Sequence, residues 1–437
     1  MLAKIETIST FAGMENLLDE LTWRGMVHDT TPGLKEHLEK GMVSGYIGFD
    51  PTASSLHIGN LATVMLLKQL QLAGHKPYAL VGGATGMIGD PSGKSKERNL
   101  LDEETLRKNQ DGVKAQLEKF LDFNCGENSA VMVNNYDWFK EIGFLQFLRN
   151  VGKHLSVNYM MAKDSVKTRL ETGISFTEFS YQLLQAYDFR HLFNEKGVTL
   201  QMGGSDQWGN ITSGTELIRR IDSGEAFALT TPLLTKADGS KFGKSEEGNV
   251  WLDADLTSPY KFYQFWLNIA DTEISKVVRV FTLFSKEEIE GFEQEYAQNP
   301  NALKRIIAKE VTIRVHSEKD YENALSASEI LFKKSGVTDA LRKLDEKLLL
   351  EVFEGVDKFN INKDRITAKP DVLTFLAEQT SIFKSKGEAR KMIANGGVSI
   401  NKEKIEKYDA VVDHELLQGK YLLVQKGKKN YYLVEAS

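Results

Sequence analysis

The chain has 437 residues, which is more than one hydrophobic core ordinarily serves, so we expect two or three domains. No apolar run approaches the roughly 18 residues that span a bilayer, and the N-terminal residues lack the pattern of a signal peptide. The net charge of −6 excludes a uniformly basic nucleic-acid coat, and the single cysteine, Cys125, excludes an internal disulfide and a cysteine-rich metal site. We therefore expect a cytoplasmic protein with no membrane association.

Short apolar runs bounded by glycine alternate with helical patterns through the first part of the chain. Residues 43–49 are predicted as a strand, residues 58–73 as a helix and residues 77–81 as the next strand. This alternation is typical of βαβ units that surround a parallel sheet. We predict an α/β domain over residues 1–250.

The first candidate site follows the first predicted strand, in the segment from Asp50 to Asn60. The start of a helix attracts anions, because its N–H groups are free and its dipole is positive there. His57 could donate a hydrogen bond to a phosphate oxygen, and Gly59 has no side chain to keep a flat nucleotide away. The alternative is a helix start that is merely capped by Ser54 or Ser55.

A glycine-rich segment, residues 82–94, follows the next predicted strand. So many glycines indicate a backbone that another group approaches closely. Its end resembles a P-loop, but Ile88 stands where the Walker spacing requires a glycine. Lys94 and Arg98 are four residues apart, on one face of a helix. The alternative is a flexible surface loop.

A third candidate lies in the helical segment 179–188. Tyr181, Gln185 and Asp188 are spaced four and three residues apart, so they project from one face. Together they could hold an ammonium group and a hydroxyl, although a solvated helix face can show the same triplet. Further along, Asp206 follows a predicted strand, at the kind of position where open α/β sheets bind ligands.

A fourth candidate is the segment 236–245, where three lysines stand among glycines and serines. It also misses the Walker spacing, because Asp238 occupies the place of the first glycine. The composition predicts a mobile basic loop suited to phosphates, with a solvated charged run as the alternative.

The rest of the chain divides by pattern into three parts. Glycine becomes rare and apolar residues recur at intervals of three and four, which predicts a helical domain over residues 251–354. The polar, aperiodic residues 355–370 are a predicted linker. Residues 371–437 predict a small α/β module with a net charge of +2, against −8 for the remainder, and its helical stretch carries Lys384, Lys386, Arg390 and Lys391.

Taken together, these segments resemble bacterial-type tyrosyl-tRNA synthetases along nearly the whole chain. His57-Ile58-Gly59-Asn60 is similar to the first class I signature, and Lys241-Phe242-Gly243-Lys244-Ser245 is similar to the second. The segments 46–52, 179–188 and 203–210 resemble the tyrosine enzymes specifically. The resemblance implies a Rossmann-type parallel-sheet catalytic domain, an all-α domain on the anticodon side and a small S4-like RNA-binding domain.

The resemblance also implies the reaction. L-tyrosine would be activated with ATP to tyrosyl-adenylate and pyrophosphate, and then transferred to the 3′ end of tRNA(Tyr) by a homodimer. ATP is the substrate and Mg²⁺ accompanies it, with no metal site held by the protein. Because the carboxylate of tyrosine is itself the nucleophile, the enzyme needs only to align it with the α-phosphorus and to neutralise the charge that grows on pyrophosphate.

Residue roles follow from the same resemblance. The residues expected to bind tyrosine are Tyr46 and Asp188 at the phenolic hydroxyl, Tyr181, Gln185 and Asp90 at the ammonium group, and Gln207 near the carboxylate. Those expected to bind ATP are Gly48, Asp50, His57, Gly59, Lys244, and Asp206 at the ribose. Those expected to act in catalysis at the phosphates are Thr52, His57, Asn60, Lys94, Arg98, Lys241, Lys244 and Ser245.

Two departures from the family pattern stand in these motifs. Asn60 replaces a second histidine, although its amide can still donate to phosphate, and Ile47 replaces a cysteine that often sits near the ribose. Three other functions are possible: a small adenylyltransferase, an RNA-binding scaffold derived from a synthetase, and activation of tryptophan. The second lysine segment and the C-terminal module disfavour the first, the retained lysines disfavour the second, and a pair suited to a hydroxyl, Tyr46 and Asp188, disfavours the third.

Overall fold

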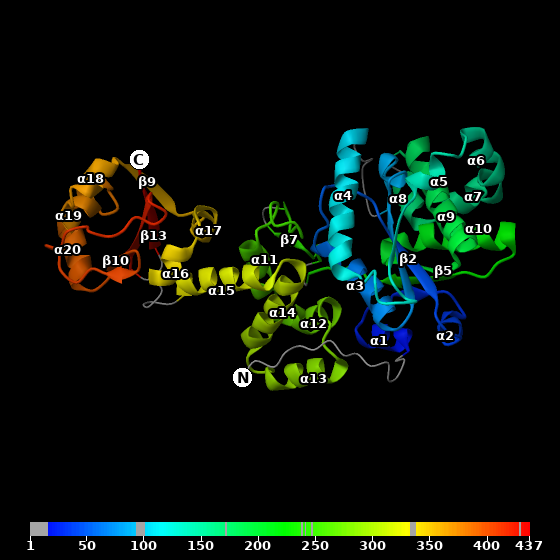
Figure 1. The fold of residues 1–437 in the computed structure, drawn as a ribbon, viewed down its shortest axis with the longest axis horizontal. Coiled ribbons are helices and arrows are strands. Elements are labelled where there is room, and N and C mark those ends of the chain that lie inside the picture. The colour runs from blue at the N-terminus through cyan, green and yellow to red at the C-terminus, as the bar shows by residue number, and fades with distance from the viewer. Residues whose placement is uncertain are drawn as a thin grey trace. The chain divides into compact units, whose positions relative to one another are not determined.

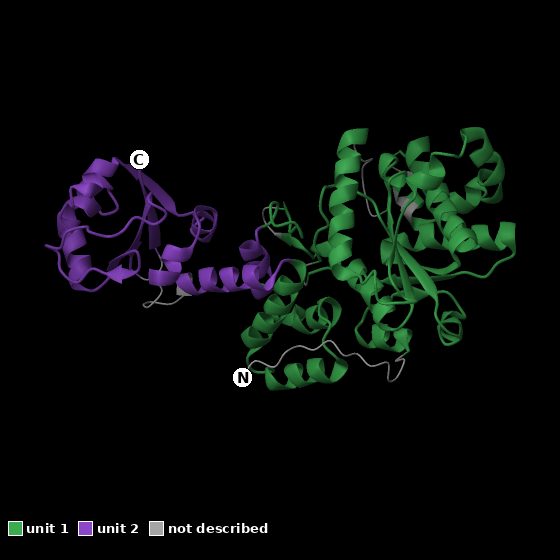
Figure 2. Cartoon of the chain, viewed as in Figure 1, with its two compact units in different colours: residues 1–257, 268–315 green, residues 258–267, 316–437 purple. Residues whose placement is uncertain are grey.

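The computed structural model in Figure 1 describes residues 16–92, 101–170, 173–236, 239–240, 242–245, 248–332, 338–427 and 430–437. The chain forms two compact units (Figure 2). Unit 1 holds the residues up to 257 and residues 268–315, and unit 2 holds residues 258–267 and 316–437. The helices predicted for residues 251–354 are thus shared between the units, and the domain boundaries at 250, 354 and 370 remain predictions.

The described residues of unit 1 form a six-stranded sheet in the order β1-β6-β5-β2-β3-β4. The strands are β1 (Asp29–Thr30), β2 (Ser44–Phe49), β3 (Lys76–Val81), β4 (Val131–Asn134), β5 (Val198–Gly204) and β6 (Phe227–Thr231). Every neighbouring pair is parallel except β1 with β6. This confirms the parallel α/β sheet that the alternating pattern predicted.

The helices that flank this sheet follow the strands in sequence. The principal ones are α3 (Ile58–Leu72), α4 (Glu103–Phe120), α9 (Phe176–Lys196) and α10 (Trp208–Asp222). The shorter ones are α1 (Leu17–Trp23), α2 (Leu34–Leu38), α5 (Tyr136–Phe139), α6 (Phe144–Asn150), α7 (Val157–Met161), α8 (Asp164–Leu170), α12 (Ile274–Phe281), α13 (Lys286–Glu295) and α14 (Pro300–Val315). Single 3-10 turns are η1 (Thr85–Met87), η2 (Gly152–His154), η3 (Ser205–Gln207) and η4 (Asp271–Glu273).

Helices cover both faces of the sheet (Figure 1). On one face, Tyr46 of β2 belongs to a buried cluster with Phe189 of α9 and Ile218 of α10. On the other face, α3 packs so closely on β2 that a Cβ at Gly45 would lie 2.9 Å from Leu70 Cδ2. Because successive side chains of a strand point to opposite faces, α3 and α9 lie on opposite sides of the sheet.

The order of the strands reverses between β2 and β5. From β2 the chain builds outward through β3 and β4, and it then returns to add β5 and β6 on the other side of β2. The connections that follow β2 and β5 therefore diverge. Open α/β sheets bind their ligands at such a switch point, outside the carboxyl ends of the strands.

Unit 2 contains a second sheet, of five strands in its described residues, in the order β11-β10-β12-β13-β9. The strands are β9 (Asp357–Ile361), β10 (Val398–Ile400), β11 (Glu403–Lys404), β12 (Tyr421–Lys426) and β13 (Asn430–Ala436). The helices of this unit are α11 (Pro259–Leu267), α15 (Glu318–Phe332), α16 (Thr338–Lys343), α17 (Glu346–Val352), α18 (Lys363–Thr367), α19 (Val372–Thr374), the π-helix η5 (Phe375–Gln379) and α20 (Lys386–Ala394).

The segment interpreted from sequence as a linker contributes to this second sheet. Residues 357–361 form β9, which pairs in parallel with β13, and Ile361 lies in the core beneath it. Three of the five residues of β9 are exposed, because it is an edge strand, and this explains why the sequence looks polar and aperiodic there. In the parts of the chain that the structure describes, no helix is long and apolar enough to cross a membrane.

Candidate active site

His57 is the residue that caps α3. Its ring Nδ1 accepts the backbone N–H of Asn60 at 3.3 Å, and the Asn60 side chain accepts the backbone N–H of His57 at 3.1 Å. The alternative of a cap by Ser54 or Ser55 is therefore wrong. Because Nδ1 accepts a hydrogen bond, a neutral His57 ring carries its proton on Nε2, which is the donor that a phosphate oxygen requires.

Gly59 is needed for a reason that the sequence did not indicate. A Cβ at this position would lie 2.8 Å from Cε1 of His57, so the glycine leaves room for the imidazole that caps its own helix. In the structure, the group that lies close to the backbone of Gly59 is the imidazole of His57. Its position requires that residue 59 has no side chain.

The second signature segment lies against the first. Ile58 donates its N–H to the Val250 carbonyl at 3.0 Å, and Leu252 donates to the Leu56 carbonyl at 2.9 Å. A Cβ at Gly243 would lie 3.0 Å from the backbone nitrogen of Gly59. Segments almost two hundred residues apart in sequence thus meet at the start of α3.

The lysines of this second segment are only partly described. Lys244 is exposed in the short strand β7 (Lys244–Ser245), which pairs with β8 (Gly248–Asn249), and its carbonyl accepts the ammonium of Lys236 at 2.9 Å. Ser245 also lies in β7. Three of the expected catalytic residues, Lys94, Arg98 and Lys241, lie outside the described residues.

The pair expected at a phenolic hydroxyl is buried on the α9 face of the sheet. Tyr46 is 1% exposed and Asp188 is 2% exposed. Asp188 accepts hydrogen bonds from Nδ2 of Asn135 at 3.0 Å and from Nε1 of Trp138 at 2.9 Å. Among the described residues, the Tyr46 hydroxyl has no hydrogen-bond partner. Buried polar groups are rarely left unpaired, so this hydroxyl is suited to a ligand.

Burial also governs the protonation of this pair. Loss of water raises the pKa of Asp188 to about 8, and the Asn135 and Trp138 donors only partly oppose this shift. Burial likewise raises the pKa of Tyr46 well above its ordinary value, and the nearby Asp188 carboxyl adds to the effect. The two groups are therefore within electrostatic reach of each other.

Tyr181 joins α9 to the end of β2. Its hydroxyl donates to Oδ2 of Asp50 at 2.7 Å, while Oδ1 of Asp50 accepts from Thr85 at 2.7 Å. Burial, followed by the Asp50 and Asp90 carboxylates, raises the pKa of Tyr181 well above its ordinary value. The carbonyl oxygen of Gln185, one turn along α9, is buried without a partner among the described residues. The triplet on α9 therefore faces the sheet, and the alternative of a solvated helix face is wrong.

Asp90 and Gln207 lie in contact although 117 residues separate them. Asp90 accepts from Nε2 of Gln207 at 2.7 Å, from the backbone of Ser92 at 3.0 Å and from Asn210 at 3.4 Å. Asp206, in η3 directly after β5, folds back over the strand end, where a Cβ at Gly204 would lie 2.7 Å from its Oδ1. The carboxyl ends of β2, β3 and β5 thus supply one group of polar side chains.

The remaining predicted residues frame this group. Gly48 is the exposed position of β2, and Thr52 is exposed just after that strand. Ile47 is 2% exposed within the sheet. The glycine-rich segment is packed by the protein's own side chains, because a Cβ at Gly82 would lie 2.1 Å from Oδ1 of Asp50. Most of residues 82–92 are buried, so the alternative of a flexible surface loop is wrong for them.

Two residues that hold the site together, Asn135 and Trp138, were not predicted from the sequence. Asn135 is fully buried, and its amide donates to both Thr85 and Asp188 while its carbonyl oxygen accepts from the backbone of Ala84. Trp138 fixes the other oxygen of Asp188. One signal was available, since Asn135 comes directly after β4 at the same edge of the sheet. In the described residues, no group of three or more His, Cys, Asp or Glu could hold a metal ion.

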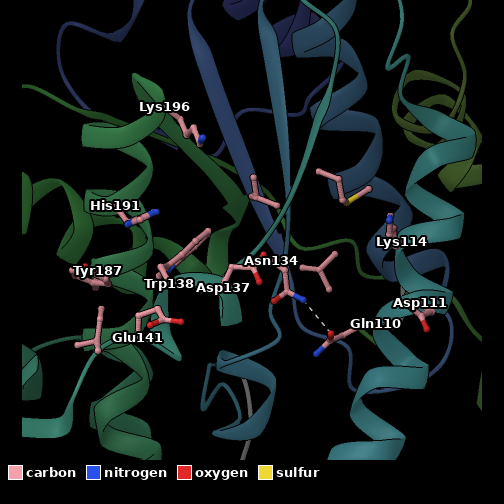
Figure 3. A pocket seen from close by; sticks show the side chains of 14 residues that line it. Gln110, Asp111, Lys114, Asn134, Asp137, Trp138, Glu141, Tyr187, His191 and Lys196 are labelled. Carbon is pink, nitrogen blue, oxygen red and sulfur yellow. Dashed lines mark hydrogen bonds between the residues drawn. The ribbon is translucent and has the colours of Figure 1, made fainter.

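A cavity of about 820 Å³ is lined in part by Trp138, the residue that donates a hydrogen bond to Asp188 (Figure 3). Residues of α4, β4, α5 and α9 line it, including Gln110, Asn134, Trp138 and His191. Trp138 stacks on His191 at 4.4 Å and turns its indole N–H to Asp188. None of the residues expected to bind tyrosine or ATP lines this cavity, so it is distinct from the candidate active site.

Comparisons with known proteins agree with this geometry. Residues 39–333 match the family model described as class I tRNA synthetases (W and Y), and residues 349–434 match the model of the SYY-like C-terminal domain of tyrosine–tRNA ligases. The chain is 65% identical to the tyrosine–tRNA ligase of Cytophaga hutchinsonii over 96% of its own length and 99% of the relative. It is 59% identical to the tyrosine–tRNA ligase of Bacteroides thetaiotaomicron over 96% of its own length and 100% of the relative.

A solved structure gives the same result. A C-terminally truncated mitochondrial tyrosyl-tRNA synthetase of Aspergillus nidulans is 28% identical, with a TM-score of 0.66 over 73% of this chain and 94% of that one. The tyrosyl-tRNA synthetase of Archaeoglobus fulgidus, 17% identical with a TM-score of 0.53, shares the fold. With both signature segments at one helix start and near full-length relatives, the chain belongs to the tyrosyl-tRNA synthetases of class I.

Proposed function

We propose that this chain activates L-tyrosine with ATP and then transfers the tyrosyl group to tRNA(Tyr). The observation that carries the choice of tyrosine is the buried pair at the floor of the site, with an unpartnered hydroxyl on Tyr46 and a carboxyl on Asp188. The near full-length identity to tyrosine–tRNA ligases supports the reaction.

The pair would select tyrosine through its own need for a partner. Asn135 and Trp138 fix both oxygens of Asp188, so the carboxyl is already oriented before a phenol arrives. Phenylalanine would leave the buried Tyr46 hydroxyl without a partner and Asp188 without the phenolic donor. A site built to bond a hydroxyl rejects the analogue without it far more strongly than an apolar pocket rejects a missing methylene, and tyrosyl-tRNA synthetases are a standard illustration.

The reaction requires alignment more than chemistry from side chains. Tyr181, Gln185 and Asp90 would hold the ammonium group, which leaves the tyrosine carboxylate to attack the α-phosphorus of ATP as pyrophosphate departs. Gln207, bonded to Asp90 at 2.7 Å, would guide the carboxylate, and Asp206 would hold the ribose. Alignment of two bound reactants removes much of the entropic barrier.

The two signature segments would neutralise the charge that develops on the leaving pyrophosphate. His57, Asn60, Thr52 and Lys244 would contact the phosphates, together with Ser245, Lys94, Arg98 and Lys241. Mg²⁺ would enter with ATP. Donors that act on developing charge lower the barrier without tightening the ground state, so rate rises more than affinity.

The experiment is exchange of labelled pyrophosphate into ATP with each of the twenty amino acids. We expect exchange with tyrosine and far less with phenylalanine or tryptophan. Equal exchange with phenylalanine would contradict the role given to Tyr46 and Asp188. Absence of exchange with every amino acid would contradict the enzyme.

We also propose that the chain works as a homodimer in the cytoplasm. Large apolar side chains of α6, α7 and the first residue of α9 are exposed, outside the buried core that these helices share. They are Leu145 at 79% exposed, Phe176 at 67%, Phe144 at 64%, Val157 at 59% and Met161 at 39%. An exposed apolar group of this kind is typical of a protein–protein interface, and a second copy is the partner that the family resemblance implies. The lone exposed thiol of Cys125 suits a reducing compartment.

A further inference from the structure

An aromatic ring stands on the surface of unit 2. Tyr408 follows β11 and is 49% exposed, whereas Ile405 and Val412 of the same segment are buried in the core of the C-terminal sheet. The guanidinium of Arg390, from α20, lies over this ring at 4.9 Å from its centroid. A cation held over one ring face fixes the orientation of the ring and leaves part of it to solvent.

Exposed cations stand on α20 and on the segment that carries this ring. Arg390, Lys391, Lys404 and Lys407 are exposed, and none has a carboxylate partner among the described residues. Other lysines of the module are paired, such as Lys386 with Glu378 and Lys426 with Glu388. Glu406 and Asp409 are exposed in the same segment, so the surface keeps a surplus of positive charge without being uniformly basic.

Two close approaches join α20 to the segment of Tyr408, and we call the residues at and beside them the α20 face: Arg390, Lys391, Gly396, Lys404 and Tyr408. Gly396 follows α20 with φ +65°, and a Cβ there would lie 2.7 Å from Nζ of Lys404. This contact brings β11 against the end of α20, and the Arg390–Tyr408 contact brings the next segment against its middle.

The chemistry of this surface identifies its ligand. Free cations favour a polyanion, and a half-exposed ring favours a flat base that is not stacked in a duplex. Single-stranded RNA offers both, since its unpaired bases stack on aromatic and guanidinium planes while its phosphates meet lysine and arginine. A regular duplex offers phosphates but hides the faces of its bases.

We propose that Tyr408 stacks on an unpaired base of the tRNA, and that Arg390, Lys391 and Lys404 contact the phosphates on either side. This inference rests on the proposed function, because the tRNA is the RNA that the enzyme charges. Arg390 has a double role, as a phosphate ligand and as the support of the Tyr408 ring.

The test measures binding of the tRNA(Tyr) transcript to the full chain across a range of salt concentrations. Tyr408→Ala and Tyr408→Leu lose one stack and weaken binding roughly tenfold at fixed salt, whereas Tyr408→Phe binds as the wild type does. The slope of log affinity against log salt stays unchanged in all three. Arg390→Gln weakens binding and lowers that slope by about one, because one phosphate contact is lost.

Val411→Ala is the matched control, since Val411 is 52% exposed three residues away and carries no ring. This variant should bind the tRNA as the wild type does.

Unchanged tRNA binding by Tyr408→Ala overturns the proposal. An equal loss of affinity with Tyr408→Phe and with Tyr408→Ala also overturns it, because it would indicate a contact through the hydroxyl. Tyrosine-dependent pyrophosphate exchange should be the same in every variant. Its absence in the wild type would instead contradict the proposed function.

Discussion

At the scale of single residues, Asp188 combines the substrate-binding role proposed for it with a cost to stability. Its carboxyl is 2% exposed, and burial raises its pKa from 3.8 to about 8. Between these two values the folded chain keeps a proton that the unfolded chain has released. Stability falls with rising pH wherever the folded state binds more protons, so the destabilisation begins near pH 4 and is complete above about pH 8.

Asp188→Asn should therefore flatten the pH dependence of stability. The free energy of unfolding of the wild type should drop between pH 5 and pH 9 more steeply than that of the variant, because the amide cannot titrate. Urea unfolding at several pH values measures both slopes. Parallel profiles would show that Asp188 does not titrate in this range.

Tyr46 is a second residue whose buried side chain suits the proposed substrate more than it suits the free protein. Its hydroxyl is buried without a partner among the described residues, so Tyr46→Phe should leave stability unchanged or raise it by about 1 kcal/mol. The same change should weaken tyrosine use and leave phenylalanine use unaltered. Urea unfolding and exchange kinetics test the two halves, with Tyr78→Phe on the neighbouring strand as control. A loss of stability would mean that the hydroxyl is bonded within the folded chain.

At the scale of elements, α3 depends on the same histidine that is expected to contact phosphate. His57→Ala should lower the free energy of unfolding by about 1 kcal/mol through loss of the cap, and it should also slow adenylate formation. Asparagine is a good cap, so His57→Asn should recover most of the stability while the rate stays low. Urea unfolding and stopped-flow measurement of adenylate formation separate these effects. Recovery of the full rate would assign His57 a structural role alone.

The exposed apolar side chains of α6, α7 and α9 form the proposed dimer interface. Leu145 of α6 is 79% exposed, and a charge there should disrupt packing against a second copy. Leu145→Glu should sediment as a monomer at micromolar concentration. Leu72→Glu is the control, because Leu72 is 55% exposed at the end of α3, away from α6, α7 and α9 in sequence and sheet face. Dimerisation of both variants would locate the interface elsewhere.

At the scale of the whole molecule, the polar groups expected to meet tyrosine and ATP lie in unit 1 and the α20 face lies in unit 2. A chain that ends at Gly355 lacks the whole C-terminal sheet, whereas one that ends at Pro370 keeps β9 without the strand that pairs with it. The shorter chain should still form tyrosyl-adenylate at close to the full rate, and tRNA charging should fail. Both half-reactions measured on the shorter chain test whether adenylate formation and tRNA binding are divided between the units, and undiminished charging would contradict an RNA-binding role for the C-terminal sheet.

The longer truncation, which ends at Pro370, should aggregate more readily than the shorter one, because it exposes an unpaired strand.

Local periodicity and short motifs were enough to predict one part of the structure. Alternation of strands and helices predicted the parallel sheet, and helical spacing placed Tyr181, Gln185 and Asp188 on one face of α9. The predicted strands also placed the candidate motifs at strand ends, which is where open α/β sheets bind their ligands. The contacts between residues far apart in sequence could not be predicted in this way: Asp50 with Tyr181, Asp188 with Asn135, and the first signature segment with Val250. These contacts depend on the order of strands within the sheet, and local periodicity carries no information about that order. For the same reason β9 looked like a linker, because an edge strand shows its pairing partner only once the sheet is assembled.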